Sequence, residues 1–173
     1  MALITMTKRE FDSLDDERLG RTCMEPTFLQ IREKDMSVKT KAISQLTEGQ
    51  KALCMFRVFY DHADNSAGEY YAWVSYLLDK PDFWCGVTGG LRFFGDASMM
   101  HLLEETKEAL EARNRKRGLQ WSDAALQDLD RDHELQYAVN LLFERFRKNA
   151  PQSHKLIGTY IRSHSNEFVI IED

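Results

Sequence analysis

Residues 47–63 read TEGQKALCMFRVFYDHA, and this stretch decides the fold class. Thr47 followed by Gln50 is the pattern of a capping box, which satisfies the unpaired amides in the first turn of a helix. The large apolar residues that follow cover most of the circumference of a helix: Leu53, Phe56, Val58, Phe59 and Tyr60. The sequence therefore predicts a helix over 48–63 at the centre of the molecule.

The next segments have the same helical periodicity. Ser66 is placed to cap a helix over 67–78, whose apolar positions recur at helical spacing: Tyr70, Trp73, Val74 and Leu77. A longer helix is expected over 97–117, because its acidic residues come early and its basic residues late, as the helix dipole favours. Gly118 supplies the expected stop.

The C-terminal third predicts two more amphipathic helices, over 134–147 and 152–164. The run Asn149, Ala150 and Pro151 separates them, because proline lacks the N–H that a continuing helix needs. The apolar tail 168–171 is strand-like and too short to form a sheet alone. We expect it to dock on the body of the protein or on a partner.

The remaining segments give weaker patterns. Pro81 is placed to start a short helix, and the sequence GVTGG at 86–90 predicts a bend between helices. Before residue 45 we expect a polar helix over about 8–19, a turn at Glu25-Pro26 and a short helix through Phe28, Leu29 and Ile31.

The length of 173 residues corresponds to one domain, and a composition of 43% apolar and 11% aromatic residues is that of a packed protein. We therefore predict an all-α fold, a single-domain multi-helix bundle with a short extended C-terminal tail. Residues 1–45 would form an N-terminal helical extension of the domain, and residues 46–173 the helical core. The expected core helices are 48–63, 67–78, 134–147 and 152–164.

The cysteines and the N-terminus favour a cytoplasmic protein. Cys23, Cys54 and Cys85 are too few and too far apart for a disulfide framework or a Cys-x-x-Cys metal site. Cys54 and Cys85 lie in apolar runs, so we expect reduced, buried thiols. Residues 1–9 lack the apolar run of a signal peptide, and no segment approaches a membrane span.

Negative charge is concentrated in the middle of the chain. The formal net charge is −5, but residues 61–111 hold 3 basic and 10 acidic residues, whereas the flanking thirds are nearly balanced. A mildly acidic whole argues against direct binding of nucleic acid, which needs clustered Lys and Arg. The acidic middle instead points to a basic protein partner.

Seven acidic residues are the candidate binding site, acting as fixed negative charge: Asp61, Asp64, Glu69, Glu104, Glu105, Glu108 and Glu111. In an ideal helix Glu104, Glu108 and Glu111 share one face, in a row whose spacing is comparable with that of phosphates along DNA. The alternative is that these residues only solvate the surface and stabilise the start of a helix.

No pattern predicts a catalytic residue, a metal or a cofactor. The glycines at 86–90 match neither the dinucleotide fingerprint nor the P-loop, and no Gly-x-Ser-x-Gly nucleophile elbow occurs. Two groups of possible metal ligands lack the Glu-x-x-His pattern of di-iron bundles: Asp61, His62, Asp64 and Glu69, and His101 with Glu104 and Glu105.

An enzyme stays open as the rival class. Its pocket would lie near an aromatic cluster, although large rings more commonly serve as core: Tyr70, Tyr71, Trp73, Trp84 and Phe94.

The order of motifs resembles a bacterial family of small all-helical proteins, long described as a domain of unknown function, whose characterised member is a DNA mimic. The matching segments span about residues 46–168: LTEGQ at 46–50, ADNSAGEYY at 63–71, GLRFFG at 90–95, LDRD at 129–132 and YIRSHSNEF at 160–168. Ser66 and Ala67 stand where the family has two glycines.

The resemblance implies an all-helical, dimeric protein whose negatively charged surface occupies the DNA-binding face of a transcription regulator. An immunity-type inhibitor that plugs a basic toxin would need the same acidic surface. The sequence leaves these two interaction functions open beside the helical enzyme.

Overall fold

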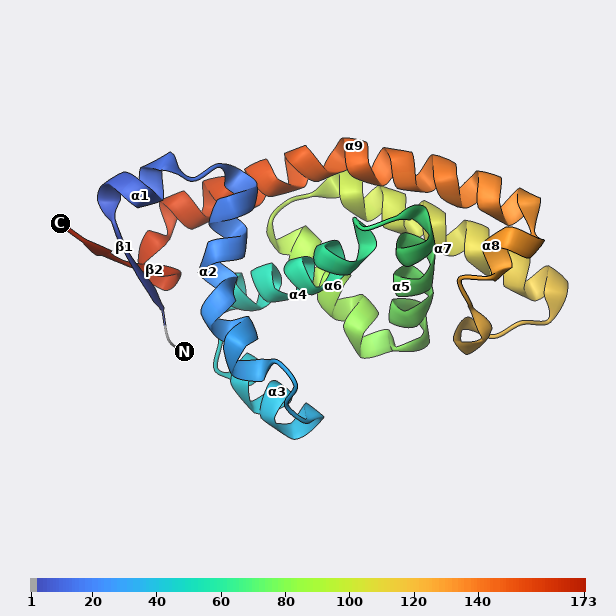
Figure 1. Cartoon of the computed structure of the whole chain (residues 1–173), viewed down its shortest axis with the longest axis horizontal. Helices are drawn as coiled ribbons and strands as arrows, with labels where there is room; N and C mark the ends of the chain where they lie inside the picture. The colour runs from blue at the N-terminus through green and yellow to red at the C-terminus, as the bar shows by residue number, and fades with distance from the viewer. Residues whose placement is uncertain (1–2) are drawn as a thin grey trace.

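The computed structural model describes residues 3–173, most of which are helical (Figure 1). The fold class is confirmed as all-α, with one small two-stranded sheet. The elements in chain order are β1 (Ile4–Thr7), α1 (Lys8–Ser13), α2 (Asp16–Ile31), α3 (Met36–Ser44), α4 (Glu48–Ala63), α5 (Ala67–Asp79), α6 (Pro81–Phe93), α7 (Ala97–Arg117), the 3₁₀ turn η1 (Trp121–Asp123), α8 (Asp128–Arg131), α9 (His133–Ser163), the 3₁₀ turn η2 (Ser165–Glu167) and β2 (Val169–Glu172).

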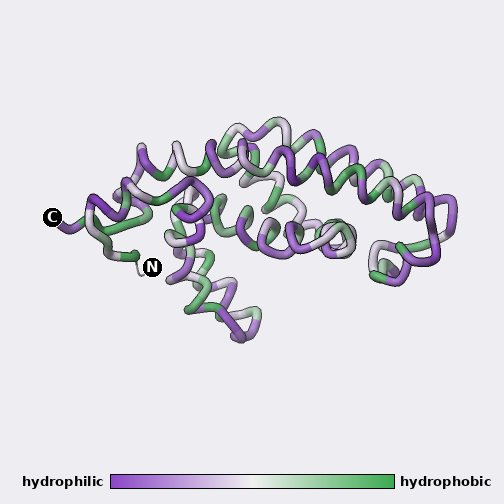
Figure 2. The backbone as a smooth tube through the Cα atoms, turned by 45° about the horizontal axis from the view of Figure 1, so that its top comes forward, coloured by the Kyte–Doolittle hydropathy of each residue, from purple (hydrophilic) through white to green (hydrophobic). Residues whose placement is uncertain are grey.

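Helix α9 runs along most of the length of the molecule and packs on α2, α5, α7 and α8 (Figure 1). The prediction of two helices divided at Pro151 is wrong, because α9 continues through this proline for 31 residues. Buried residues keep helical spacing on both sides of it: Leu135, Val139, Leu142, Phe146, Ala150, Ile157 and Ile161. Packing of this continuous stripe outweighs the backbone hydrogen bond lost at the proline. Figure 2 shows hydrophilic and hydrophobic positions alternating along the helix.

Helix α4 lies in the centre, as its sequence predicts. The Thr47 hydroxyl accepts from the backbone N–H of Gln50, and the Gln50 side chain accepts from the backbone N–H of Thr47, so the capping box is confirmed. The Ser66 hydroxyl caps α5 by accepting from the backbone N–H of Glu69, and Gly118 ends α7 with a left-handed φ of 66°.

The glycine-rich stretch at 86–90 is not a bend, which corrects that prediction: it lies inside α6, which packs closely on α4. A Cβ atom on Gly90 would lie 2.9 Å from the carbonyl oxygen of Ala52. Gly90 therefore serves the close approach of two helices rather than a turn.

The N-terminal 45 residues also differ from expectation. The chain breaks at Leu14, because the Asp15 side chain accepts from the Arg18 amide and starts α2 there. The predicted turn at Glu25-Pro26 is wrong, since α2 continues through Pro26. Its buried residues pack against α4 and α9, so residues 3–45 and 46–173 contribute to one core.

The apolar tail docks on the body as β2, which pairs in parallel with β1, and Ile4 lies opposite Val169. Just before β2, the Glu167 carboxylate accepts from the Thr47 hydroxyl at 2.6 Å, which ties the tail to the start of α4. Cys54 is buried as expected, but Cys85 is exposed, because the α6 positions that face α4 are Gly86 and Gly90.

Two glycines of α6 provide a test of the close helix contact. Gly90→Ala should lower the free energy of unfolding by about 1–3 kcal/mol, because the new methyl group overlaps backbone atoms of α4. Gly89→Ala is the matched control, because nothing in the described structure lies within 4 Å of a Cβ atom at this position. Alanine there should raise the free energy of unfolding by up to about 1 kcal/mol. Urea denaturation measures both. Equal effects of the two substitutions would contradict the packing role of Gly90.

Candidate functional site

The seven predicted acidic residues do not form one acidic surface. Five have basic neighbours: Asp61 with Arg57, Asp64 with Arg147, Glu104 with Lys107, Glu105 with Arg145, and Glu111 with Arg115. Glu69 and Glu108 make no ion pair among residues 3–173.

Helix α9 separates the acidic residues into two groups. Arg145 and Arg147 are two positions apart, so they project from nearly opposite sides of the helix. Arg145 binds Glu105 of α7, and Arg147 contacts Asp64 at the end of α4. The carboxylates of α4 and α7 therefore lie on different flanks of α9.

Asp61 is held by a buried cation. The Arg57 side chain is 1% exposed and donates from Nη2 to the Asp61 carboxylate, while its Nε and Nη1 have no hydrogen-bond partner among residues 3–173. Burial lowers the pKa of Arg57, and burial raises the pKa of Asp61 although the guanidinium opposes this. Both shifts express the cost of removing charge from water. Asp61 thus has a structural role that its sequence position does not reveal.

An apolar groove lies between the α2–α3 hairpin and the helices α4, α5 and α6. Figure 1 shows α3 and the end of α2 projecting from the body beside these helices. The groove encloses about 410 Å³. Its apolar walls include Phe28 and Ile31 of α2, Met36 and Ile43 of α3, and Met55 and Val58 of α4. Small-molecule sites are commonly of this size and largely apolar.

Stacked rings form one wall of this groove. The His62 ring lies 4.0 Å from that of Trp73, and the Trp73 ring 5.1 Å from that of Tyr76, which is followed by Phe83. The indole N–H of Trp73 is shielded from solvent and has no acceptor in the described part of the chain. A buried donor without an acceptor is costly, so a ligand that offers an acceptor would gain by meeting it.

The remaining charges of the groove are mainly positive. Arg32 and Lys39 line it, and neither forms an ion pair or side-chain hydrogen bond with any described residue. The acid that lines it, Asp61, is occupied by Arg57. We call this combination of apolar walls, free indole N–H and two free cations the cationic groove.

The predicted aromatic cluster does not surround this groove, since Trp73 is its one member among the lining residues. Tyr70 and Tyr71 are core residues whose hydroxyls bond to Thr106 and Asp128. Sequence reasoning missed Arg32 and Lys39, because single cations in a weakly patterned segment carry no signal. Arg57 did carry one, as a lone charge within an otherwise apolar helical run.

The pairing of Arg57 with Asp61 gives a testable difference between the acidic residues. Asp61→Ala should cost about 2 kcal/mol of unfolding free energy, less than the 3–5 typical of a fully buried pair, because Asp61 is 38% exposed. Glu108→Ala, the control, should change it by less than about 0.5 kcal/mol. Adding Arg57→Met to Asp61→Ala should restore stability. Failure of the double variant to recover would contradict an uncompensated buried charge as the cause.

Three further findings bear on the site. Within the described part of the chain, no group of three or more His, Cys, Asp or Glu side chains could hold a metal ion, and no helix is long and apolar enough to cross a membrane. Comparisons with protein-family models, with curated proteins and with solved structures find no match to this chain.

Proposed function

We propose that this protein binds a small amphipathic anion, an acyl or aryl carboxylate, in the cationic groove. The observation that carries the proposal is the pair of free cations, Arg32 and Lys39, beside a largely apolar groove of about 410 Å³. The apolar part of the ligand would pack between α3 and the aromatic wall, and its carboxylate would lie near the cations.

The polar groups of the groove select the sign of the ligand. Arg32, Lys39 and the Trp73 indole offer donors that no protein acceptor uses, whereas the Asp61 carboxylate already accepts from Arg57. A carboxylate can accept from several of these donors at once. A cationic ligand would meet two positive charges and find the groove's carboxylate occupied.

Direct measurement of ligand binding tests this function. Isothermal titration of the protein with decanoate should show saturable one-to-one binding. The double variant Arg32→Gln, Lys39→Gln should have a Kd about tenfold higher, which corresponds to about 1.4 kcal/mol of binding free energy. Uncharged 1-decanol should bind the wild type and this double variant equally. The matched control, Arg92→Gln with Lys155→Gln, removes two exposed cations outside the groove. No saturable binding, or equal weakening in the control, would refute the proposal.

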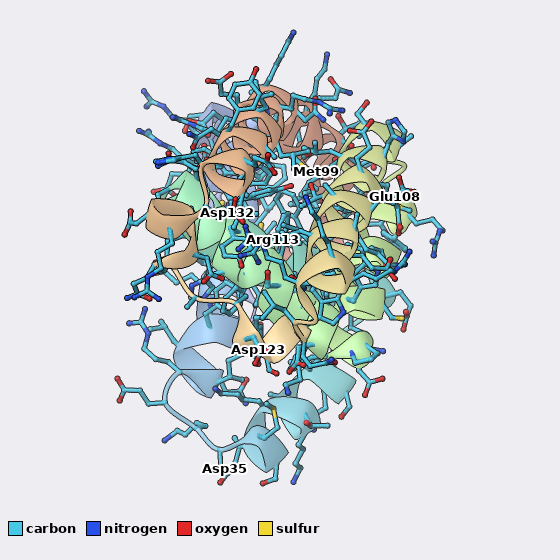
Figure 3. The ribbon with its side chains drawn as sticks, turned by 90° about the vertical axis from the view of Figure 1, so that its right-hand side faces the viewer. Asp35, Met99, Glu108, Arg113, Asp123 and Asp132 are labelled. Carbon is cyan, nitrogen blue, oxygen red and sulfur yellow. The ribbon has the colours of Figure 1, made fainter. Side chains whose placement is uncertain are left out.

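A second candidate is capture of a basic protein partner, such as the DNA-binding face of a regulator, by a homodimer or a single chain. The specific observation that favours it is the row of Glu104, Glu108 and Glu111 on α7. Glu108 is exposed and makes no ion pair with any described residue, and Figure 3 shows it on the outer side of the helix. The ion pairs of Glu104 with Lys107 and of Glu111 with Arg115 are partly exposed to solvent. Exposed pairs of this kind are weak and compete poorly with a partner's cations. The resemblance to the DNA-mimic family supports this candidate.

Charge reversal tests the second candidate. Glu104→Lys with Glu108→Lys should reduce capture of a partner from the native host at low salt and flatten its salt dependence, because fewer ion pairs are screened. The control, Glu25→Lys with Glu144→Lys, changes the same charge at exposed, unpaired positions elsewhere. Partner capture that is equal in both double variants would remove the α7 row from any binding site.

A further inference from the structure

A second cavity, of about 480 Å³, lies where the start of α2, the end of α4 and the middle of α9 meet. Four carboxylates line it against one guanidinium, that of Arg147: Asp15, Asp16 and Glu17 from α2, and Asp64 from the end of α4. The rest of its lining is Tyr60, Ala150, Pro151 and His154. This polar cavity is separate from the cationic groove, with which it shares no residue.

His154 gives this cavity an unsatisfied polar group. The residue is 6% exposed, and its Nε2 has no hydrogen-bond partner among the residues that the structure describes. Its ring stands edge-on to Tyr60 at 4.5 Å and to Phe56 at 5.4 Å. Burial lowers the pKa of His154, with Arg57 and Arg21 acting in the same direction and Glu17 and Asp64 opposing them. The neutral ring can present a lone pair to a donor.

Pro151 removes a donor from the same region. Because proline has no N–H, the carbonyl oxygen of Arg147 lacks its regular helical donor. Hydrogen-bond acceptors therefore outnumber donors around the polar cavity. These acceptors are the four carboxylates, the His154 ring and the Arg147 carbonyl oxygen.

The protein's own cations hold most of these carboxylates weakly. Asp15 pairs with Arg18 at 3.4 Å, Glu17 with Arg21 at 3.2 Å and Asp64 with Arg147 at 3.7 Å, and all three arginine side chains are well exposed. Such surface pairs contribute about 0–1 kcal/mol, so another cation can displace them at little cost. Asp16 differs, because Arg162 binds both its carboxylate and the Leu14 carbonyl.

We propose that the polar cavity binds a linear aliphatic diamine or polyamine. One ammonium group would be held by the α2 carboxylates and another by Asp64. The methylene chain would pass over the apolar surfaces of Tyr60, Ala150 and Pro151, and His154 would accept from an ammonium N–H. Ammonium groups joined by methylenes match carboxylates on two separate elements with apolar surface in the same cavity, whereas no described cluster fits a metal ion.

Isothermal titration calorimetry of the full chain with putrescine tests the site. Saturable binding is expected, with about tenfold weakening in Glu17→Gln and again in Asp64→Asn. Glu134→Gln makes the same change of charge at an exposed position near the start of α9, outside the cavity, and should leave the affinity unchanged. The neutral analogue 1,4-butanediol should not bind.

The nitrogen resonances of His154 in ¹⁵N-histidine-labelled protein give a second readout, which non-specific attraction would not move. Putrescine should shift the His154 Nε2 resonance and leave that of the exposed His133 in place. Absence of saturable binding, or equal weakening in Glu134→Gln, overturns the proposal, as does an unmoved His154 signal. The decanoate titration tests the cationic groove alone, so a negative result at one site leaves the proposal for the other site unaffected.

Discussion

The continuity of α9 through Pro151 is the constraint on which the rest of the structure depends. Its 31 residues span about 46 Å at 1.5 Å per residue, long enough to contact both the N-terminal helix α2 and the distant α7 and α8. A proline inside a helix costs about 3 kcal/mol, which is comparable with the burial of one or two large apolar side chains. The buried stripe of α9 has several on each side of the proline, so tertiary packing decides against a break.

The same helix explains why charge that is concentrated in sequence is not concentrated on the surface. The acidic middle third is packed against the C-terminal third, whose helix α9 places Arg145 and Arg147 between the two acidic groups. At the start of α9, Arg113 of α7 donates to the N-cap residue Asp132 at 3.2 Å, and Figure 3 shows these two side chains beside each other. The Arg113 guanidinium also lies 3.6 Å from the Asp128 carboxylate of α8. Much of the opposite charge in this fold therefore joins helices to one another.

The sequence predicted the elements whose signals are local. Capping residues such as Thr47, Ser66 and Gly118 act within one turn, so the starts of α4 and α5 and the end of α7 could be placed from spacing alone. Gly90, Pro26 and Pro151 were misjudged, because their usual local effect is overridden by contacts with residues distant in the chain. The cationic groove was out of reach for a related reason: its walls come from five helices, and the unpaired state of Arg32 and Lys39 is a property of the assembled surface.

Helix α2 links the two proposed sites and gives them opposite sign. Its first turn carries Asp15, Asp16 and Glu17 to the polar cavity, and its last turn carries Phe28, Ile31 and Arg32 to the cationic groove. Acids at the start of a helix and a cation at its end both suit the macrodipole, so each charge stabilises the helix before any ligand is present. Sixteen residues place the two ends about 24 Å apart, more than two Debye lengths at physiological salt. Ligands at the two sites would therefore interact little through solvent, and a site-selective substitution at one end should leave binding at the other intact.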